Sequence, residues 1–167
     1  WLINIENKVE DITKLKYFVS ELNNRLKAID KDLYKIIWYD SVIENGTLTW
    51  QNELNSLNYN FFELSDGFFV NYTWKEENLR NSKKNADKRF SDVYVGIDVF
   101  GRGVLGNGGF NSNLALDKIK ENNLSCALFA PGWLHECNDP TDFYKNSDLF
   151  WNLLSKNLER RKIRALP

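Results

Sequence analysis

Methionine is absent from this chain of 167 residues, and histidine, cysteine and proline are scarce, with one, two and three copies. His135 and the two cysteines, Cys126 and Cys137, are too few and too widely spaced for a zinc knuckle. Two cysteines also exclude a disulfide scaffold, and they fit a reducing compartment. We therefore predict neither a metal nor a cofactor. Because the chain lacks methionine and opens at Trp1 in an apolar segment, we expect it to be part of a longer protein.

An excess of charge of one sign is also missing. Lys and Arg number 22 and Asp and Glu 23, for a formal net charge of −1. This balance leaves no excess of positive charge that would attract a nucleic acid or an anionic membrane. No apolar run approaches the roughly 20 residues that a membrane span requires. We therefore expect neither nucleic acid nor membrane as a partner, and one domain over residues 1–167.

Five short apolar runs recur along the chain, at residues 1–5, 35–39, 67–71, 93–100 and 125–130. Runs of this length are typical of strands that are buried on both faces, as in a parallel sheet. Helical periodicity follows in residues 11–29, 48–62, 113–123 and 143–161, and the polar segment 74–91 predicts an exposed helix or loop. Strands that alternate with helices predict an α/β fold with right-handed crossovers.

Two architectures share this pattern, the open doubly wound sheet and the (β/α)8 TIM barrel. The predicted strands end in polar or aromatic residues, among them Asn4, Asp40, Asn71 and Asp98. The active face of a barrel collects functional side chains at the carboxyl ends of successive strands, so we favour the barrel. A complete barrel takes about 250 residues, so about five βα units make a partial one.

Asn4 and Glu6 form the first candidate site. Residues two apart in a strand share a face, so these side chains would project into the barrel together while Ile3 and Ile5 face the helices. A partly desolvated carboxyl group there could hold a proton near neutral pH and donate it. An adjacent amide could orient a polar substrate group. From the residues alone, a surface position for Glu6 at the start of a helix explains the pattern better.

Aromatic residues, at 14% of the chain, supply the second candidate site. Trp38 and Tyr39 end one predicted strand, and Trp50, Trp74 and Trp133 also lie in segments that follow strands. Flat apolar rings stack on the C–H faces of sugars, and few charges accompany them, so the pattern favours a neutral carbohydrate over a phosphate. The alternative for Trp38 is plain core packing.

Residues 101–106 match G-x-G-x-x-G after a predicted strand, which raises a nucleotide-dependent enzyme as another hypothesis. The glycine-rich residues that follow oppose the helix start that a dinucleotide site needs, so we predict a mobile loop near a site instead. Asp98 is expected to face the interior with Gly96. There it could bind sugar hydroxyls, tune Glu6, or serve as an internal hydrogen-bond partner.

Taken together, several motifs resemble the cytosolic endo-β-N-acetylglucosaminidases of glycoside hydrolase family 85. They are WLINIEN at 1–7, WYDS at 38–41, WQ at 50–51, NYTW at 71–74, GIDV at 96–99 and FAPGW at 129–133. The resemblance implies a (β/α)8 catalytic barrel followed by β-sandwich modules, in a cytosolic enzyme. It also implies hydrolysis of the β-1,4 bond within the N,N'-diacetylchitobiose core of N-linked glycans and glycopeptides.

The resemblance further implies roles for individual residues. Glu6 would be the general acid, and Asn4 would orient the substrate's 2-acetamido group for attack on the anomeric carbon. This is the substrate-assisted exception to the scheme with two carboxylates. Tyr39 would hydrogen-bond near the acetamido group, and Trp50 and Trp74 would shape the sugar subsites. The expected substrate-binding set is Trp38, Trp50, Asn71, Trp74, Asp98 and Trp133.

The resemblance also implies what residues 1–167 would lack. We expect them to form the central to C-terminal part of the catalytic barrel, without its N-terminal strands or the β-sandwich modules. A second hypothesis therefore stays open, in which the chain is a non-catalytic glycan-binding or inactive barrel fragment with unpaired sheet edges.

Overall fold

The computed structural model describes residues 1–158, and five parallel strands form its centre. The strands are β1 (Leu2–Ile3), β2 (Ile37–Tyr39), β3 (Gly67–Val70), β4 (Val93–Asp98) and β5 (Ser125–Phe129). Their order in the sheet is the order in the sequence, β1-β2-β3-β4-β5. A doubly wound sheet reverses its strand order at one point, and this sheet does not. The winding is that of a barrel, and the prediction of a partial (β/α)8 barrel with five βα units is confirmed.

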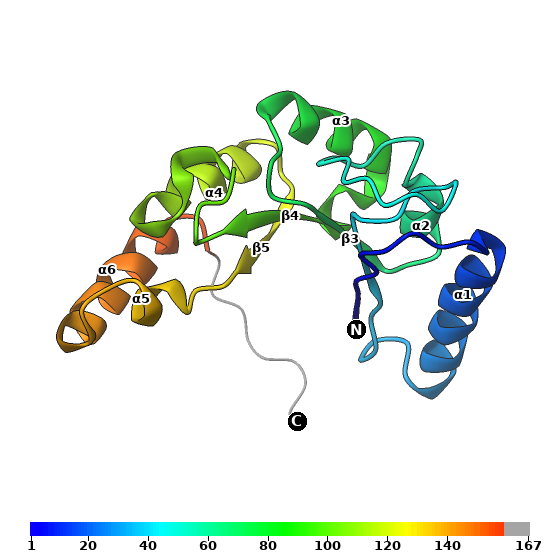
Figure 1. The fold of residues 1–167 in the computed structure, drawn as a ribbon, viewed down its shortest axis with the longest axis horizontal. Coiled ribbons are helices and arrows are strands. Elements are labelled where there is room, and N and C mark those ends of the chain that lie inside the picture. The colour runs from blue at the N-terminus through cyan, green and yellow to red at the C-terminus, as the bar shows by residue number, and fades with distance from the viewer. Residues whose placement is uncertain (159–167) are drawn as a thin grey trace.

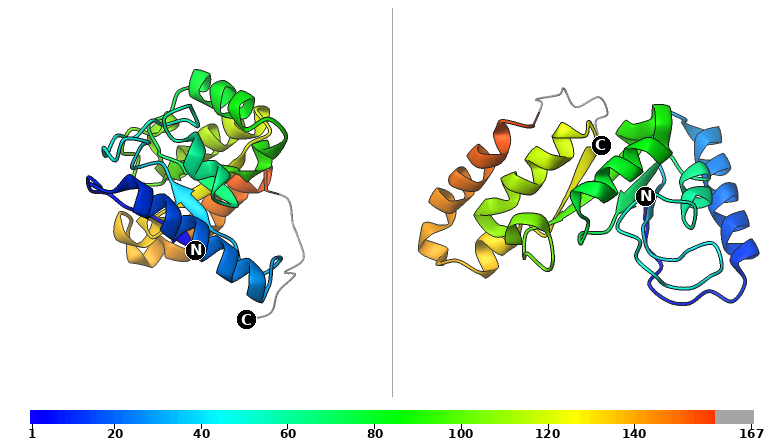
Figure 2. Two further views of the ribbon diagram at one scale, coloured as in Figure 1. Left: turned by 90° about the vertical axis from the view of Figure 1, so that its right-hand side faces the viewer. Right: turned by 90° about the horizontal axis from the view of Figure 1, so that it is seen from above.

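Helices line the outer side of this sheet, which curves as an arc in Figure 1, and Figure 2 shows the same layers from two other directions. The longer ones are α1 (Ile12–Ile29), α3 (Glu76–Ala86), α4 (Ser112–Glu121) and α6 (Phe143–Ser155), and the short ones are α2 (Tyr59–Glu63) and α5 (Trp133–Glu136). The described part of the chain also has four 3-10 turns: η1 (Asp87–Asp92), η2 (Leu105–Asn107), η3 (Gly109–Asn111) and η4 (Pro140–Asp142). No helix within residues 1–158 combines the length and apolar character needed to cross a membrane.

The core lies between the sheet and the helices. Alternate residues of β4, Val93, Val95 and Ile97, point to this side and are fully buried. Trp38 of β2 is also fully buried, and its ring stacks on that of Phe61 from α2 at 4.1 Å between centroids. The opposite alternation places polar and aromatic side chains on the concave face of the arc. The strand pattern therefore separates a packed core from a face that carries chemistry.

The segment 48–62 corrects the sequence prediction, because it is mostly loop and only α2 is helical. Side chains in this stretch bind nearby backbone groups in a non-helical path. Asn58 Oδ1 accepts from the Asn55 N–H at 2.8 Å, and Asn55 Oδ1 accepts from the Leu57 N–H at 2.9 Å. Asparagine competes with the helical hydrogen bonds in this way, so the apolar periodicity is misleading here.

The other predicted helices are present with small shifts in their ends. Asp11 caps α1 by accepting from the Lys14 N–H at 3.0 Å. The polar segment 74–91 forms α3 and most of η1. The last helix ends at Ser155, and residues 159–161 of that prediction lie outside the described residues.

Candidate functional site

Polar side chains converge where β1 to β4 end, on the concave face. Asn4 and Glu6 follow β1, Tyr39 ends β2, Asn71 follows β3 and Asp98 ends β4. Because the strands are parallel and in sequence order, all of these ends lie along one rim of the sheet.

Asn4 and Glu6 share a face, as the alternation predicted. Ile3 and Ile5 pack against the core, whereas Asn4 and Glu6 are exposed. Asn4 Nδ2 donates a hydrogen bond to Glu6 Oε1 at 3.2 Å. The expected partial burial of Glu6 is not seen, because β1 pairs only with β2 among the described residues and one side of the carboxylate faces solvent. The pair is therefore an amide and a carboxylate held side by side at an open rim.

Tyr39 lies on the neighbouring strand with only 5% of its surface exposed. Its hydroxyl donates to Asn71 Oδ1 at 2.7 Å. Burial raises the pKa of Tyr39, and the nearby Tyr72 and Glu6 add to the rise. The phenol remains protonated at physiological pH and acts through its hydrogen bonds.

Asp40, the residue after Tyr39, is fully buried beneath this rim. Its side chain accepts from the backbone N–H groups of Gln51 at 3.1 Å and Asn52 at 2.7 Å. Burial raises its pKa to about 6, although these hydrogen bonds and those from Asn71 and Asn58 oppose the rise. The carboxylate thus anchors the loop after β2 to the sheet.

Asp98 faces the concave side of the sheet as expected, and two groups of this chain form hydrogen bonds with its carboxylate. Arg102 Nε donates to Asp98 Oδ2 at 2.6 Å, and the Phe100 N–H donates to Oδ1 at 3.0 Å. Asp98 is 1% exposed, and the Arg102 side chain is 65% exposed at the rim. Both oxygens of Asp98 thus have internal partners, and its predicted binding of sugar hydroxyls stays a prediction.

The four predicted tryptophans divide into two pairs. Trp38 and Trp74 lie in the core, where Trp74 Nε1 donates to the Gly96 carbonyl at 2.8 Å. Trp50 is 43% exposed on the loop after β2. Trp133 is half-buried at the start of α5 and packs edge-on against Phe110. Only Trp50 and Trp133 leave part of a ring open to a ligand.

Tyr72 was missing from the predicted set. Its ring lies 5.3 Å from that of Phe129 and 5.9 Å from that of Phe69, between centroids, and it covers Gly96. Strand alternation does not predict the face on which Tyr72 lies, because β3 and its alternation both end at Val70. Arg102 was also missed, since a loop residue carries no periodicity.

The glycine-rich residues 101–109 do not form a dinucleotide site. Gly101, Gly103 and Gly106 have φ between +82° and +89°, and the chain passes through η2 and η3 before α4 begins at Ser112. In the part of the chain that the structure describes, no α-helix therefore begins within the motif or directly after it. Within residues 1–158, no group of three or more His, Cys, Asp and Glu side chains could hold a metal ion.

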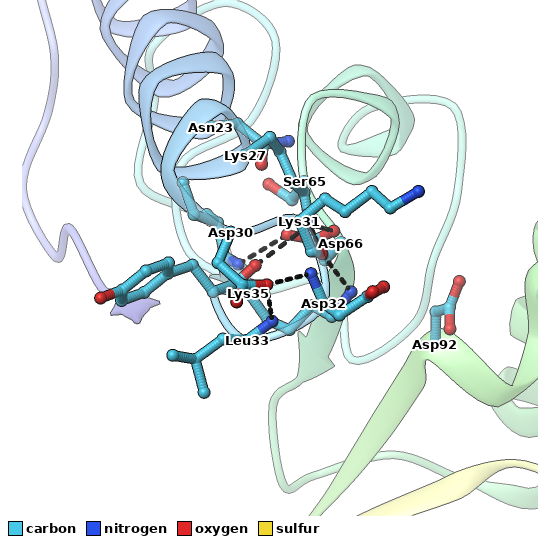
Figure 3. A network of polar contacts seen from close by, with 12 residues as sticks. Asn23, Lys27, Asp30, Lys31, Asp32, Leu33, Lys35, Ser65, Asp66 and Asp92 are labelled. Atoms are coloured by element: carbon cyan, nitrogen blue, oxygen red, sulfur yellow. Dashed lines mark hydrogen bonds and ion pairs between the residues drawn. The ribbon is translucent and has the colours of Figure 1, made fainter. Parts of the chain in front are cut away.

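A separate polar network ties the chain together at the amino ends of β2 and β3 (Figure 3). Asp66 pairs with Lys27 of α1 and accepts from the Ile36 N–H at 2.8 Å. Asp30 accepts from the N–H groups of Asp32 and Leu33 in the turn after α1. Residues at this end of a barrel support stability, and chemistry takes place at the other end.

Comparison with known proteins adds to this geometry. The family model described as glycosyl hydrolase family 85 matches residues 1–166. The chain is 45% identical over 170 residues to the cytosolic endo-beta-N-acetylglucosaminidase of Gallus gallus and 42% identical over 173 residues to that of Homo sapiens. Both matches cover 100% of this chain and 23% of the relative. Cytosolic endo-beta-N-acetylglucosaminidase 2 of Arabidopsis thaliana is 48% identical over 159 residues, which cover 94% of this chain and 22% of the relative.

The fold has a counterpart among solved structures. The glycoside hydrolase domain of Endo-D from Streptococcus pneumoniae R6 superposes with a TM-score of 0.69 at 24% identity, over 89% of this chain and 25% of that one. The chain thus spans about a quarter of the length of the curated relatives it matches. With the family model matched over almost every residue, the chain belongs to glycosyl hydrolase family 85.

Proposed function

We propose that this chain carries the catalytic centre of a mannosyl-glycoprotein endo-β-N-acetylglucosaminidase. The observation that carries the proposal is the pair of Asn4 and Glu6, an amide and a carboxylate 3.2 Å apart at the carboxyl end of β1. Relatives that bear this enzyme's name match the chain at 41–48% identity, which supports the same reaction. The substrate is the β-1,4 bond in the diacetylchitobiose core of N-linked glycans and glycopeptides.

In the proposed mechanism, Glu6 donates its proton to the glycosidic oxygen that leaves. Asn4 holds the 2-acetamido group so that its carbonyl oxygen attacks the anomeric carbon and forms an oxazoline. Glu6, now a carboxylate, then takes a proton from water, which opens the oxazoline and restores the acetamido group with retained configuration. One protein carboxylate suffices because the substrate supplies the nucleophile.

Tyr39 supports this scheme as a hydrogen-bonding group beside Glu6, and its buried ring gives the hydroxyl a fixed position. Trp50, Tyr72 and Trp133 offer partly open rings for the apolar faces of sugars. Trp38 and Trp74 are core residues, and they stabilise the strands that carry the rim. The names of the relatives favour the cytosol as the compartment, and no cofactor takes part in the mechanism.

The test is release of the glycan from a high-mannose glycopeptide by the complete natural polypeptide that contains residues 1–167. We expect Glu6→Gln to reduce release by several orders of magnitude, since general acid catalysis contributes about 10²–10⁴-fold. Asn4→Ala should impair hydrolysis of the glycopeptide more than hydrolysis of a preformed sugar oxazoline. Glu10→Gln, an exposed carboxylate outside the site, is the matched control and should leave release unchanged. Unchanged release with Glu6→Gln would contradict the proposal.

The open rim around Glu6 favours one second candidate, a glycan-binding protein without turnover. Calorimetric titration of residues 1–167 with the same glycopeptide separates the two candidates. Binding without release by the complete polypeptide supports the second candidate, and release supports the first.

A further inference from the structure

Asp40 is a buried carboxylate that the proposed mechanism does not use. Its carboxylate is fully buried and accepts four hydrogen bonds, from the backbone N–H groups of Gln51, Asn52 and Asn71 and from Asn58 Nδ2. Among residues 1–158, no lysine or arginine forms an ion pair with it. A buried charge without a cation costs stability. The four hydrogen bonds of this carboxylate hold the loop that follows β2 in one geometry.

The bond to Asn52 leads from Asp40 toward the rim. The Asn52 N–H donates to Asp40 Oδ2 at 2.7 Å, and Asn52 has a left-handed backbone with φ of 57°. In this conformation, Asn52 Oδ1 accepts from the Thr73 N–H at 3.1 Å and from Asn71 Nδ2 at 2.8 Å. The backbone N–H of Thr73 can only donate, so the oxygen of the Asn52 amide must face it.

The orientation of Asn52 then determines that of Asn71. Since Asn52 presents an oxygen, Asn71 must present its NH2 group in return, and its own Oδ1 points the other way. That oxygen accepts the proton of the Tyr39 hydroxyl at 2.7 Å. The hydroxyl oxygen of Tyr39 is therefore an acceptor, and Tyr72 is its hydrogen-bonding neighbour on the concave face.

We infer that Asp40 is a positioning residue that fixes the Tyr39 hydroxyl through Asn52 and Asn71. Each link has a single orientation, because the carboxylate can only accept and the Thr73 N–H can only donate. The result is a phenol whose proton is directed to Asn71 and whose oxygen can accept from Tyr72 and from a second donor, such as an amide N–H of the substrate. This role rests on the proposed function, in which Tyr39 contacts the sugar.

The experiment is a double-mutant cycle in the complete natural polypeptide, with kcat and KM for glycopeptide hydrolysis as the readout. Asp40→Asn places an NH2 group against N–H donors and so breaks the first link. Asn52→Gly removes the amide but tolerates the left-handed backbone, and it keeps the N–H that binds Asp40. Each variant should lower kcat about tenfold with little change in KM. In a Tyr39→Phe background, neither should lower kcat further, because the hydroxyl that they position is gone.

The matched control is Ser82→Ala. Ser82 Oγ is buried and accepts from the Leu54 N–H at 2.9 Å, so it holds the same loop without touching the link to Tyr39. It should lower the melting temperature and leave kcat unchanged. If Asp40→Asn fails to fold, Asn52→Gly alone decides. Equal losses of kcat in the wild-type and Tyr39→Phe backgrounds would overturn the inference.

A second readout does not depend on turnover. With 13C at the ζ carbon of tyrosine, the Tyr39 resonance reports hydrogen bonding of its hydroxyl. Asn52→Gly should shift this resonance, and Ser82→Ala should not. A shift without any glycan release by the unsubstituted polypeptide would refute the proposed function while the link from Asp40 to Tyr39 stands. No shift with Asn52→Gly would overturn the link itself.

Discussion

Asp40 also makes the folding stability depend on pH. Burial raises its pKa from 3.8 to about 6, so the folded state binds the proton more tightly than the unfolded state does. Stability therefore falls as the pH rises from about 4 to about 6, and it is independent of this group outside that window. A difference of this size corresponds to about 3 kcal/mol at most.

Urea unfolding of wild type and Asp40→Asn at a series of pH values checks this prediction. The other carboxylates are common to both proteins, so their contributions cancel in the difference. The unfolding free energy of the wild type, minus that of the variant, should decline between pH 4 and pH 6 and be level above pH 7. A difference that rises over that range would contradict a raised pKa for Asp40.

Individual residues of the site differ in how well the sequence predicts them. Asn4 and Glu6 could be found because strand alternation is a local rule, and Ile3 and Ile5 identify the buried face. The exposure of Glu6 could not be predicted in this way, since it depends on which strands flank β1. Tyr72 belongs to a segment after the last paired residue of its strand, where alternation no longer applies.

Among the elements, β4 depends on a glycine at its centre. An added Cβ on Gly96 would lie 2.6 Å from Tyr72 Cδ1 and 2.8 Å from the Val70 carbonyl oxygen. The Val70 oxygen is backbone and cannot move aside without disturbing β3. We expect Gly96→Ala to lower the free energy of unfolding by about 1–3 kcal/mol, the usual cost of overpacking. Denaturant unfolding measures this loss.

Gly132→Ala provides the control for that prediction. An added Cβ at Gly132 would meet only the end of the Glu136 side chain, which can turn away, and its φ of −55° suits alanine. Its stability should stay within about 0.5 kcal/mol of wild type. If the two variants were equally stable, the close packing of Tyr72 over Gly96 would be wrong.

The elements that the sequence predicts well are those with one dominant period. The five strands can be found because each is a short apolar run, and α1 because it repeats one apolar stripe over five turns and begins at a capping aspartate. The prediction for segment 48–62 fails because Asp40, Asn55 and Asn58 bind its backbone in a loop. Those bonds join residues as far as 12 apart, and a periodicity argument does not include them.

At the scale of the whole molecule, the strands differ in length and in their number of paired neighbours from one side of the sheet to the other. β4 spans six residues and pairs with strands on both sides, whereas β1 spans two residues and pairs with β2 alone within residues 1–158. The proposed catalytic pair directly follows the weaker strand. The site is thus attached to the shortest of the five described strands, which has one neighbour among residues 1–158.

Hydrogen exchange of residues 1–167 tests this gradient. Amides of β3 and β4 are paired on both sides and should exchange slowest, because they open only with the whole sheet. The amide of Ile37, which donates to the Trp1 carbonyl at 2.8 Å, should exchange faster because β1 frays readily. A glycopeptide bound at Asn4 and Glu6 should slow exchange at β1 and β2 and leave the α6 amides as they were. Equal protection of Ile37 and the β4 amides in the free protein would contradict the gradient, and glycopeptide protection confined to β5 would place the glycan away from Glu6.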